Sequence, residues 1–476
     1  MEAITTESQE TLAMHTQSNR IKRIYSSQQD YFAAGHTRSF AFRKAALIKL
    51  RNAVKTNEMK IVEAIYKDFR KSEFEVYGTE IGPVYTELRH ILSGLRGLMK
   101  PKKVNTPLPF FPSKSWIYRE PLGNTLIISP WNYPFTLLMR PLISAIAGGN
   151  TVILKPSEIA PHTARLIAQM IAENFEESHI AVIEGNGEQI GRELLMNYHF
   201  DHVFFTGSVA VGKKIMEMAS KHLSPVTLEL GGKSPCIIDK EVNLAFAAKK
   251  IAWSKFVNAG QTCVAPDYVL VHEEVRDSFI AKLKEVITGM YGDDPKHSPD
   301  YPRIISEKRF LALNGYLANK RQIIFGGETE FSQLYIAPTI LAGVDADDDV
   351  MREEVFGPIL PVISYRDNRE VFEWVNRNPY PLALYIYTSN KTTARFFSEN
   401  IRFGGGCINN GLIHVGNVEL PFGGVGTSGI GASNGHYGFD TFTREKAMMD
   451  TPTWMDAPLW YPPYKDNVKW IRKIFR

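Results

Sequence analysis

The distribution of apolar residues predicts helices over the first hundred residues and alternating strands and helices beyond them. Between 21 and 100, apolar positions recur at intervals of three and four, as in Ile61, Ile65 and Phe69, which is the spacing of helices with one buried face. Five short runs of β-branched and apolar residues follow, at 124–129, 151–155, 179–183, 202–206 and 226–230. Stretches of helical length separate these runs, which indicates βαβ units around a parallel sheet. We therefore expect a doubly wound α/β domain.

The same alternation restarts after Gly232 and predicts a second α/β domain. Its strand candidates are 235–239, 268–272, 322–326, 358–365, 382–388 and 404–410. The strands of the first set are followed by polar or glycine-bearing turns with the sequences SPWN, KPSE, EGNG, TGS and LGGK. Ligands of open parallel sheets bind beyond the carboxyl ends of the strands. These turns should therefore line one crevice that faces the second domain.

The composition agrees with a globular protein of several domains and excludes some classes. The chain has 476 residues, 44% of them hydrophobic and 22% charged, and a single core rarely grows to this size. The 55 basic residues exceed the 51 acidic ones by too few to make nucleic acid the main partner. Three cysteines without a CxxC pair give neither a disulfide framework nor a zinc site. They suit a reducing compartment such as the cytoplasm.

The sequence predicts neither secretion nor a membrane-spanning helix. Residues 1–20 are polar and lack the apolar core of a signal peptide, so we expect a disordered or extended segment there. The most apolar window, 126–149, is interrupted by Pro130, Pro134 and Pro141 and cannot be a uniform spanning helix. The aromatic and basic tail from 453 onward leaves room for a surface contact with a membrane or for a docked extension.

The main nucleophile candidate is Cys263, in the tetrapeptide GQTC. A thiolate can attack a carbonyl carbon, and the preceding glycine, glutamine and threonine favour a turn over a core strand. The alternative is a buried cysteine that acts as a small apolar residue. We expect that alternative for Cys236 and Cys407, because both lie inside strand-like runs.

A candidate general base is Glu229, in the segment TLELGGK. Leu228 and Leu230 flank it, and burying a carboxylate without a partner is costly. The side chain should therefore point into a cleft, where a desolvated carboxylate can act as a base, or it should pair with Lys233 or another cation. The sequence leaves both interpretations open.

Two turns of the first domain offer further polar groups. Asn132 in SPWNYP could donate its amide to an oxygen that becomes negative during acyl chemistry, although asparagine between prolines is often only a turn residue. Lys155 and Glu158 in KPSE suit the vicinal hydroxyls of a ribose.

Two other segments could hold a nucleotide. The small residues Gly207, Ser208 and Gly212 of FTGSVAVG would let a pyrophosphate approach a helix N-terminus, although an ordinary strand-to-helix turn has the same composition. In REEVFGP, Glu354 could accept from a sugar hydroxyl, and Phe356 could press against a flat heteroaromatic ring.

Taken together, these segments resemble the aldehyde dehydrogenase superfamily. PWNYP, KPSE, FTGS, LELGGK, GQTC, EEVFGP and LPFGGVG occur in the order of that family. Longer phrases, such as SEFEVYGTEIG and NAGQTCVAPDYVLVHE, are similar to its shorter class 3 and fatty-aldehyde branch. The resemblance covers roughly residues 21 to 465.

The resemblance implies that the protein oxidises an aldehyde to a carboxylic acid with NAD, or with NADP, through a thiohemiacetal and a thioester. Cys263 would attack the aldehyde, Asn132 and the Cys263 backbone N–H would hold the oxyanion, and Glu229 would activate water. The residues implied at the cofactor are Lys155 and Glu158 at the adenosine ribose, Gly207 and Ser208 at the pyrophosphate, with Gly212 in the same turn, and Glu354 and Phe356 at the nicotinamide.

The expected substrates are medium- or long-chain aliphatic or aromatic aldehydes. Two alternatives remain beside this reaction. A CoA-acylating enzyme would not need Glu229 to activate water, and a catalytically silent binding protein of the same fold would not need Cys263, Glu229 and Asn132 together.

The branch also implies three structural parts and a homodimer. We expect a dinucleotide-binding domain over 21–230, with 102–120 in a β extension for oligomerisation, and a catalytic domain over 231–415. Residues 416–476 would form a glycine-rich return, an oligomerisation segment and a C-terminal tail. The segments GLIHVGNVELPFGG and SNGHYGFD depart from the branch, which unsettles the choice of substrate.

Overall fold

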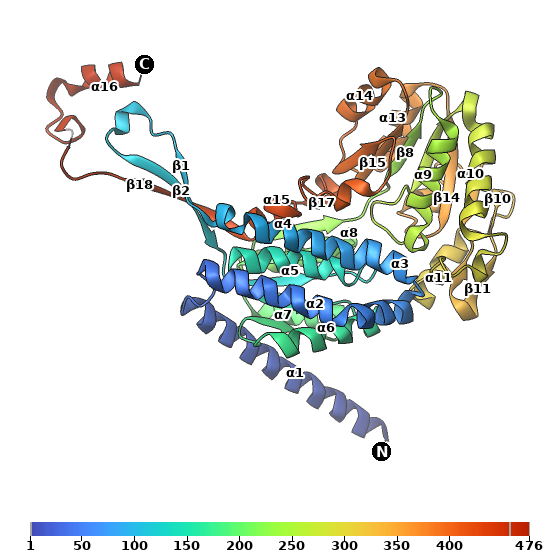
Figure 1. Cartoon of the computed structure of the whole chain (residues 1–476), viewed down its shortest axis with the longest axis horizontal. Coiled ribbons are helices and arrows are strands. Elements are labelled where there is room, and N and C mark those ends of the chain that lie inside the picture. The colour runs from blue at the N-terminus through green and yellow to red at the C-terminus, as the bar shows by residue number, and fades with distance from the viewer. Residues whose placement is uncertain (1, 457, 476) are drawn as a thin grey trace.

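The computed structural model of the chain consists of two α/β domains and a projecting β arm (Figure 1). It describes residues 2–456 and 458–475. Its three parts confirm the predicted fold class, an α/β dinucleotide-binding domain, a second α/β domain and a small β extension.

The first domain is built on a six-stranded sheet with the strand order β17-β7-β6-β3-β4-β5. All neighbouring strands are parallel except β17, which runs antiparallel to β7. The strands are β3 (Asn124–Ile128), β4 (Thr151–Lys155), β5 (Ile180–Val182), β6 (His202–Gly207), β7 (Val226–Leu230) and β17 (Gly429–Ile430).

Helices cover both faces of this sheet, as a doubly wound domain requires. Neighbouring residues of β3 illustrate this, because Leu126 packs into one apolar core and Ile127 into another. One face carries α2 (Phe40–Phe69), α4 (Gly82–Met99), α5 (Thr136–Gly148) and α6 (Pro161–Asn174). The opposite face carries α1 (Glu2–Ala33), α7 (Gly187–Asn197) and α8 (Val209–Ser220).

The prediction of a disordered or extended segment over residues 1–20 is wrong. The chain forms one continuous helix, α1, from Glu2 to Ala33. No proline or glycine interrupts this stretch, so its polarity does not prevent it from extending the amphipathic turns that bury Ile21 and Ile24. Gln17 donates to the carbonyl of Glu184 over 2.7 Å, which ties the helix to the domain.

The second domain has a seven-stranded sheet with the order β10-β13-β14-β9-β8-β15-β16. The pairing is parallel except between β10 and β13. The strands are β8 (Pro235–Ile238), β9 (Tyr268–His272), β10 (Ile323–Phe325), β13 (Thr339–Ala342), β14 (Ile359–Tyr365), β15 (Ala383–Tyr387) and β16 (Gly405–Ile408). β13, which lies between β10 and β14, was not predicted from the sequence.

Four helices and several short elements complete this domain. The helices are α9 (Leu244–Phe256), α10 (Arg276–Tyr291), α13 (Asn368–Arg377) and α14 (Lys391–Asn400). The short elements of this domain include α11 (Glu307–Gly315), α12 (Asp349–Arg352), β11 (Thr329–Glu330) and β12 (Tyr335–Ile336). In the first domain, α3 (Glu73–Val76) and a π-helical turn (Tyr77–Ile81) lie between α2 and α4.

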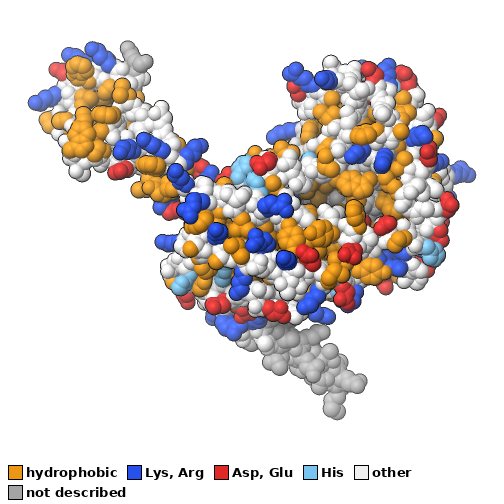
Figure 2. Space-filling view, viewed as in Figure 1, with side chains coloured by type: hydrophobic (Ala, Val, Ile, Leu, Met, Phe, Trp, Pro, Cys, Tyr) orange, Lys and Arg blue, Asp and Glu red, His pale blue; other side chains and the backbone are white. Residues whose placement is uncertain are grey.

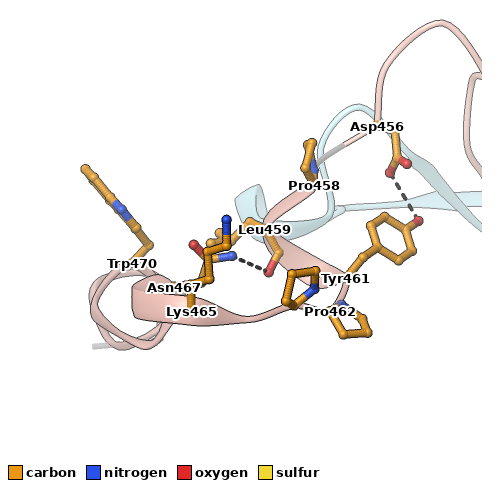
Figure 3. Close-up of a pocket in the computed structure, with 9 residues that line it drawn as sticks. Asp456, Pro458, Leu459, Tyr461, Pro462, Lys465, Asn467 and Trp470 are labelled. Carbon is orange, nitrogen blue, oxygen red and sulfur yellow. Dashed lines mark hydrogen bonds between the residues drawn. The ribbon is translucent and has the colours of Figure 1, made fainter.

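The arm is a three-stranded antiparallel sheet that projects from the first domain (Figure 1). It consists of β1 (Lys102–Val104), β2 (Lys114–Pro121) and β18 (Thr443–Asp450), in the order β1-β2-β18. The chain enters β18 from α15 (Gly435–Thr441) and continues into a tail that ends with α16 (Val468–Ile474). Figure 3 shows a hollow formed by this tail, where Tyr461 contacts Asp456 and Asn467 contacts Leu459. Within the described residues, no helix has the length and apolar character needed to cross a membrane.

A glycine-rich return segment, residues 421–434, connects the second domain back to the first. Its strand β17 pairs Gly429 with Glu229 of β7. A side chain at Gly429 is excluded, because its Cβ would lie 2.4 Å from the carbonyl oxygen of Leu228, and its φ is +156°. The return segment therefore lies directly beside the candidate base.

Candidate active site

The turn that carries Cys263 is held in an unusual conformation. After α9 ends, Asn258, Ala259 and Gly260 all adopt left-handed backbone angles, with φ of 55°, 49° and 72°. Only glycine fits at position 260, because a Cβ would lie 2.2 Å from the carbonyl oxygen of Gly357. Strained turns of this kind persist where surrounding contacts enforce them, and they cluster at functional sites.

The other two residues of the GQTC motif anchor the turn. The Gln261 amide donates to the carbonyls of Asn258 and Arg303 over 3.0 Å each, and it accepts from the Ile305 N–H over 3.0 Å. The Thr262 hydroxyl is 2.6 Å from that of Tyr133. The motif thus fixes the position of the cysteine between the two domains.

Two cavities meet at Cys263. The glycine-lined cavity, about 630 Å³, is bordered by turns of both domains and by Gly207, Gly231 and Gly232. The apolar cavity, about 530 Å³, is bordered by α5, α9 and residues of the return segment. Among the described residues that line them, Cys263 and Glu229 are shared by both cavities. A reagent in each cavity would therefore meet the other at these two side chains.

The thiol of Cys263 is neutral at rest. The side chain is partly exposed, and desolvation raises the pKa of its thiol, with a further rise from the negative charges of Glu354 and Glu229. A neutral thiol is a weak nucleophile. Attack on a carbonyl at this site therefore requires the thiol to lose its proton as the carbon–sulfur bond forms.

Glu229 lies near the carboxyl end of β7 and is bonded by two hydroxyls. Thr206 donates to its Oε2 over 3.3 Å, and Ser433 donates to its Oε1. Burial raises the pKa of this carboxyl to about 7, and the Ser433 hydrogen bond opposes that rise. The alternative ion pair with Lys233 does not form, because Lys233 bonds the carboxylate of Asp267 instead.

Asn132 is buried in the turn that follows β3 and lines the glycine-lined cavity. Its amide donates to the carbonyl of Gln261 over 3.1 Å, next to the cysteine turn. Its own backbone carbonyl accepts from the Asn258 amide over 2.8 Å and from Lys71 over 3.3 Å. The structure therefore holds the predicted oxyanion donor against the turn that carries the predicted nucleophile.

The FTGS turn lies where β6 leads into α8. Gly207 and Ser208 line the glycine-lined cavity, and the Ser208 hydroxyl caps α8 by accepting from the Val211 N–H over 3.3 Å. Gly212 does not line it. A Cβ there would lie 2.6 Å from Leu230, so this glycine permits close packing of helix on strand.

Glu354 and Phe356 reach the same cavity from the second domain. Glu354 accepts from the Gly232 N–H, and burial, followed by the charge of Asp267, raises the pKa of this carboxyl to about 8. The Phe356 ring packs edge-on against Trp131 with ring centroids 5.3 Å apart. These groups lie opposite the FTGS turn.

Lys155, the last residue of β4, and Glu158, in the turn after it, do not border either cavity at Cys263. The ammonium of Lys155 is 3.1 Å from the Glu158 carboxylate, which also accepts from the Gly187 N–H over 2.7 Å. Both lie at the carboxyl end of β4, the strand next to β3 in the sheet. They therefore occupy the same sheet edge, one strand further out.

The sequence did not single out three polar residues of the site. Thr206 and Ser433 bond Glu229, and Arg309 lines the glycine-lined cavity with its guanidinium 6.0 Å from the Phe356 ring. Thr206 was detectable in principle, since it precedes Gly207. Ser433 is 204 positions from Glu229, and no local pattern connects the two. Over 2–456 and 458–475, no cluster of histidine, cysteine and carboxylate side chains could hold a metal ion.

Comparison with known proteins places this geometry in a family. The model of the Aldehyde dehydrogenase family matches residues 2–448. The chain is 44% identical to 4,4'-diaponeurosporen-aldehyde dehydrogenase of Staphylococcus aureus over 96% of this chain and 100% of that protein. It is 42% identical to aldehyde dehydrogenase family 3 member B1 of Rattus norvegicus, over 92% and 93% of the two chains.

The fold is also similar to that of a solved structure. The substrate-bound state of Staphylococcus aureus AldH superimposes with a TM-score of 0.94 at 44% identity, covering 96% of this chain and 99% of that one. The chain therefore belongs to the aldehyde dehydrogenase family and is an NAD(P)-dependent oxidoreductase that acts on aldehydes.

Proposed function

We propose that the two cavities hold the two reactants and that the reaction takes place at Cys263. NAD(P)⁺ binds in the glycine-lined cavity and the aldehyde in the apolar cavity. The observation that carries this proposal is that Cys263 and Glu229 border both cavities. The expected steps thus converge on one sulfur atom and one carboxylate.

The lining of the glycine-lined cavity fits a dinucleotide. A Cβ at Gly231 would lie 2.1 Å from the Glu354 carboxylate. Glycine therefore lets the backbone pass close to this carboxylate, which can accept a hydrogen bond from a ribose hydroxyl. The N-terminus of α8, at Gly207 and Ser208, offers N–H groups and a favourable dipole to the pyrophosphate. When bound, the nicotinamide accepts a hydride, and Glu354 and Phe356 hold its ribose and ring.

The residues of this chain prepare the carbon–sulfur bond. The Cys263 thiol gives up its proton to solvent as the sulfur bonds to the aldehyde carbon, because burial favours the neutral thiol before that bond forms. The thiolate attacks the aldehyde carbon, and the resulting oxyanion accepts from the Asn132 amide and the Cys263 N–H. Such donors typically contribute about 10²–10³ in rate.

Glu229 acts as the general base when the thioester is hydrolysed. It takes a proton from water as the water oxygen attacks the acyl carbon, and the carboxylic acid leaves Cys263 free. A pKa of about 7 suits this role. A base whose pKa lies near the working pH is ionised in much of the enzyme and is still able to bind a proton. An enzyme that transfers the acyl group to coenzyme A would not need this hydrolysis step. A catalytically silent binding protein would not need Cys263 and Glu229 at the junction of the two cavities.

The apolar cavity favours medium- or long-chain aliphatic or aromatic aldehydes. Its wall includes Leu137, Trp253, Val257, Leu412, Ile413 and Phe422. Burying methylene groups or a ring against such side chains stabilises the complex by about 0.8 kcal/mol per CH₂. The decisive experiment is a series of alkanals and aromatic aldehydes with NAD⁺, read at the NADH absorbance. Equal kcat/KM for acetaldehyde and for long or aromatic aldehydes would contradict this substrate class.

We expect NAD⁺ to be used in preference to NADP⁺ by at least about tenfold in kcat/KM, because Glu158 would meet the 2′-phosphate with a like charge. The Glu158→Gln variant should lower the ratio of kcat/KM with NAD⁺ to kcat/KM with NADP⁺. The exposed Glu188, on the first turn of α7, provides a matched control, and Glu188→Gln should leave the ratio unchanged. A wild-type preference for NADP⁺ would contradict the expectation.

We propose that the arm joins two copies of this chain into a homodimer. Figure 2 shows apolar side chains gathered on the arm and tail. The exposed apolar residues of this part of the chain include Met448 and Met449 of β18, Trp454 and Trp470. Large exposed apolar patches usually mark an interface.

We also propose a cytoplasmic location, because the three free cysteines suit a reducing compartment.

Light scattering should give a mass of twice the 53.8 kDa of one chain. Replacing Met448 and Met449 together by glutamate should give monomers. Met59→Glu, which changes an exposed methionine of α2, should not affect the mass. A monomeric wild-type protein at micromolar concentration would rule out the dimer.

A further inference from the structure

Ser433 belongs to the return segment and contacts the candidate base. Its hydroxyl lies between two oxygen atoms, Oε1 of Glu229 and the carbonyl of Phe422, which is 3.4 Å away. The side chain is partly exposed and borders the apolar cavity. It is therefore in contact with the candidate base on the side where the substrate would lie.

The backbone fixes this hydroxyl in place. Ser433 and Phe422 form an antiparallel bridge, with N–H to carbonyl distances of 2.7 and 3.0 Å. Two residues before Ser433, a Cβ at Gly431 would lie 2.9 Å from the Thr227 hydroxyl, so the segment runs closely along β7. The position of Ser433 relative to Glu229 thus depends on the fold and not on the rotamer of a long side chain.

A hydroxyl between a carboxyl and a carbonyl can satisfy both protonation states of the carboxyl. When Glu229 is ionised, Ser433 donates to Oε1, and this hydrogen bond favours the charged form. When Glu229 carries a proton, the carboxyl donates to Ser433 Oγ, and the Ser433 hydrogen turns to the Phe422 carbonyl. Ser433 keeps its own proton throughout, so only hydrogen bonds are exchanged.

We propose that Ser433 is a positioning residue for the general base: its hydroxyl turns between Glu229 and the Phe422 carbonyl as Glu229 loses and gains the proton of the reaction. This inference rests on the proposed role of Glu229. Thr206 contacts the other carboxyl oxygen over 3.3 Å and keeps the side chain oriented while the Ser433 hydrogen bond reverses. The positive charge of Arg140 also lowers the pKa of Glu229, and substitution of Ser433 leaves that charge in place.

The test is the pH profile of steady-state kcat with an aldehyde and NAD⁺. Ser433→Ala removes the donor to the ionised carboxylate, so the acidic limb should move to higher pH by about one unit, which is about a tenfold loss of kcat below the midpoint. The loss should shrink toward high pH, where Glu229 is ionised in both proteins. Ser433→Thr keeps a hydroxyl and should restore the wild-type profile.

Thr441→Val is the matched control, because Thr441 donates to the carbonyl of Ala432 over 2.6 Å and does not bond Glu229. It should leave the limb unchanged. The inference is overturned if Ser433→Ala gives the wild-type profile, or if Thr441→Val shifts the limb equally. Glu229→Gln separates the two ideas. Normal turnover of that variant defeats the proposed function, whereas a stalled Glu229→Gln enzyme with an unshifted Ser433→Ala profile defeats only the role of Ser433.

Discussion

Replacing Cys263 by alanine should abolish NADH formation from any aldehyde, with a fall in kcat of at least about 10³-fold. In the proposed reaction, hydride leaves a carbon that is bonded to this sulfur. Without the sulfur this intermediate cannot form, so hydride transfer should not occur. The substitution removes one atom from a side chain that is already partly exposed. Cofactor binding, followed by quenching of tryptophan fluorescence, should therefore be retained.

Cys407 offers the matched control for this variant. It is also a free, partly exposed cysteine of the second domain, but its sulfur lies 3.6 Å from the ring of His414 and does not border either cavity at Cys263. Cys407→Ala should keep wild-type turnover. Activity of Cys263→Ala at the wild-type rate would remove this residue from the nucleophile role.

The Glu229→Gln variant should form NADH in the first turnover and then stall, with steady-state kcat lower by about 10²–10⁴-fold. Glutamine keeps the shape of the side chain and an oxygen for the Ser433 hydroxyl, but it cannot take a proton from water. The thioester would therefore accumulate. Rapid mixing that resolves a burst followed by a slow phase measures both rates, and steady turnover at the wild-type rate would contradict the base role.

The pH dependence of the wild-type enzyme follows from the same carboxyl. Its pKa lies at about 7 because burial disfavours the charged form. A base works only when ionised, so kcat should rise as the pH increases through about 7 and then level off. The residual rate of Glu229→Gln should lack this limb. The sign would be reversed if Glu229 acted as an acid in the slow step.

Much of the fold could be predicted from the sequence because strands of buried parallel sheets are runs of apolar residues with polar turns between them. The pattern also reveals Asn132, which follows such a run, and Glu229, a carboxylate between two leucines inside one. Two strands were harder to predict. β13 is inserted between β10 and β14. β17 is two residues long and joins a sheet whose other strands precede it by about 200 to 300 residues, so no local pattern reveals the pairing.

The local sequence also could not predict the partners of the site residues. The choice between a cleft-facing Glu229 and an ion pair with Lys233 was settled by Asp267, which bonds Lys233 from another part of the chain. The helical state of residues 2–20 was missed for a different reason. A polar segment without proline or glycine can continue a helix that is anchored further along, so polarity alone does not indicate disorder.

The most direct test of the account is to trap the acyl group on the enzyme. Glu229→Gln is mixed with an aldehyde and NAD⁺, quenched in acid and digested, and the cysteine peptides are weighed by mass spectrometry. The account predicts that the peptide with Cys263 gains the mass of the acyl group, and that this gain requires NAD⁺. An unmodified Cys263 peptide after NADH has formed, or an acyl group found on Cys236 or Cys407 instead, would contradict it.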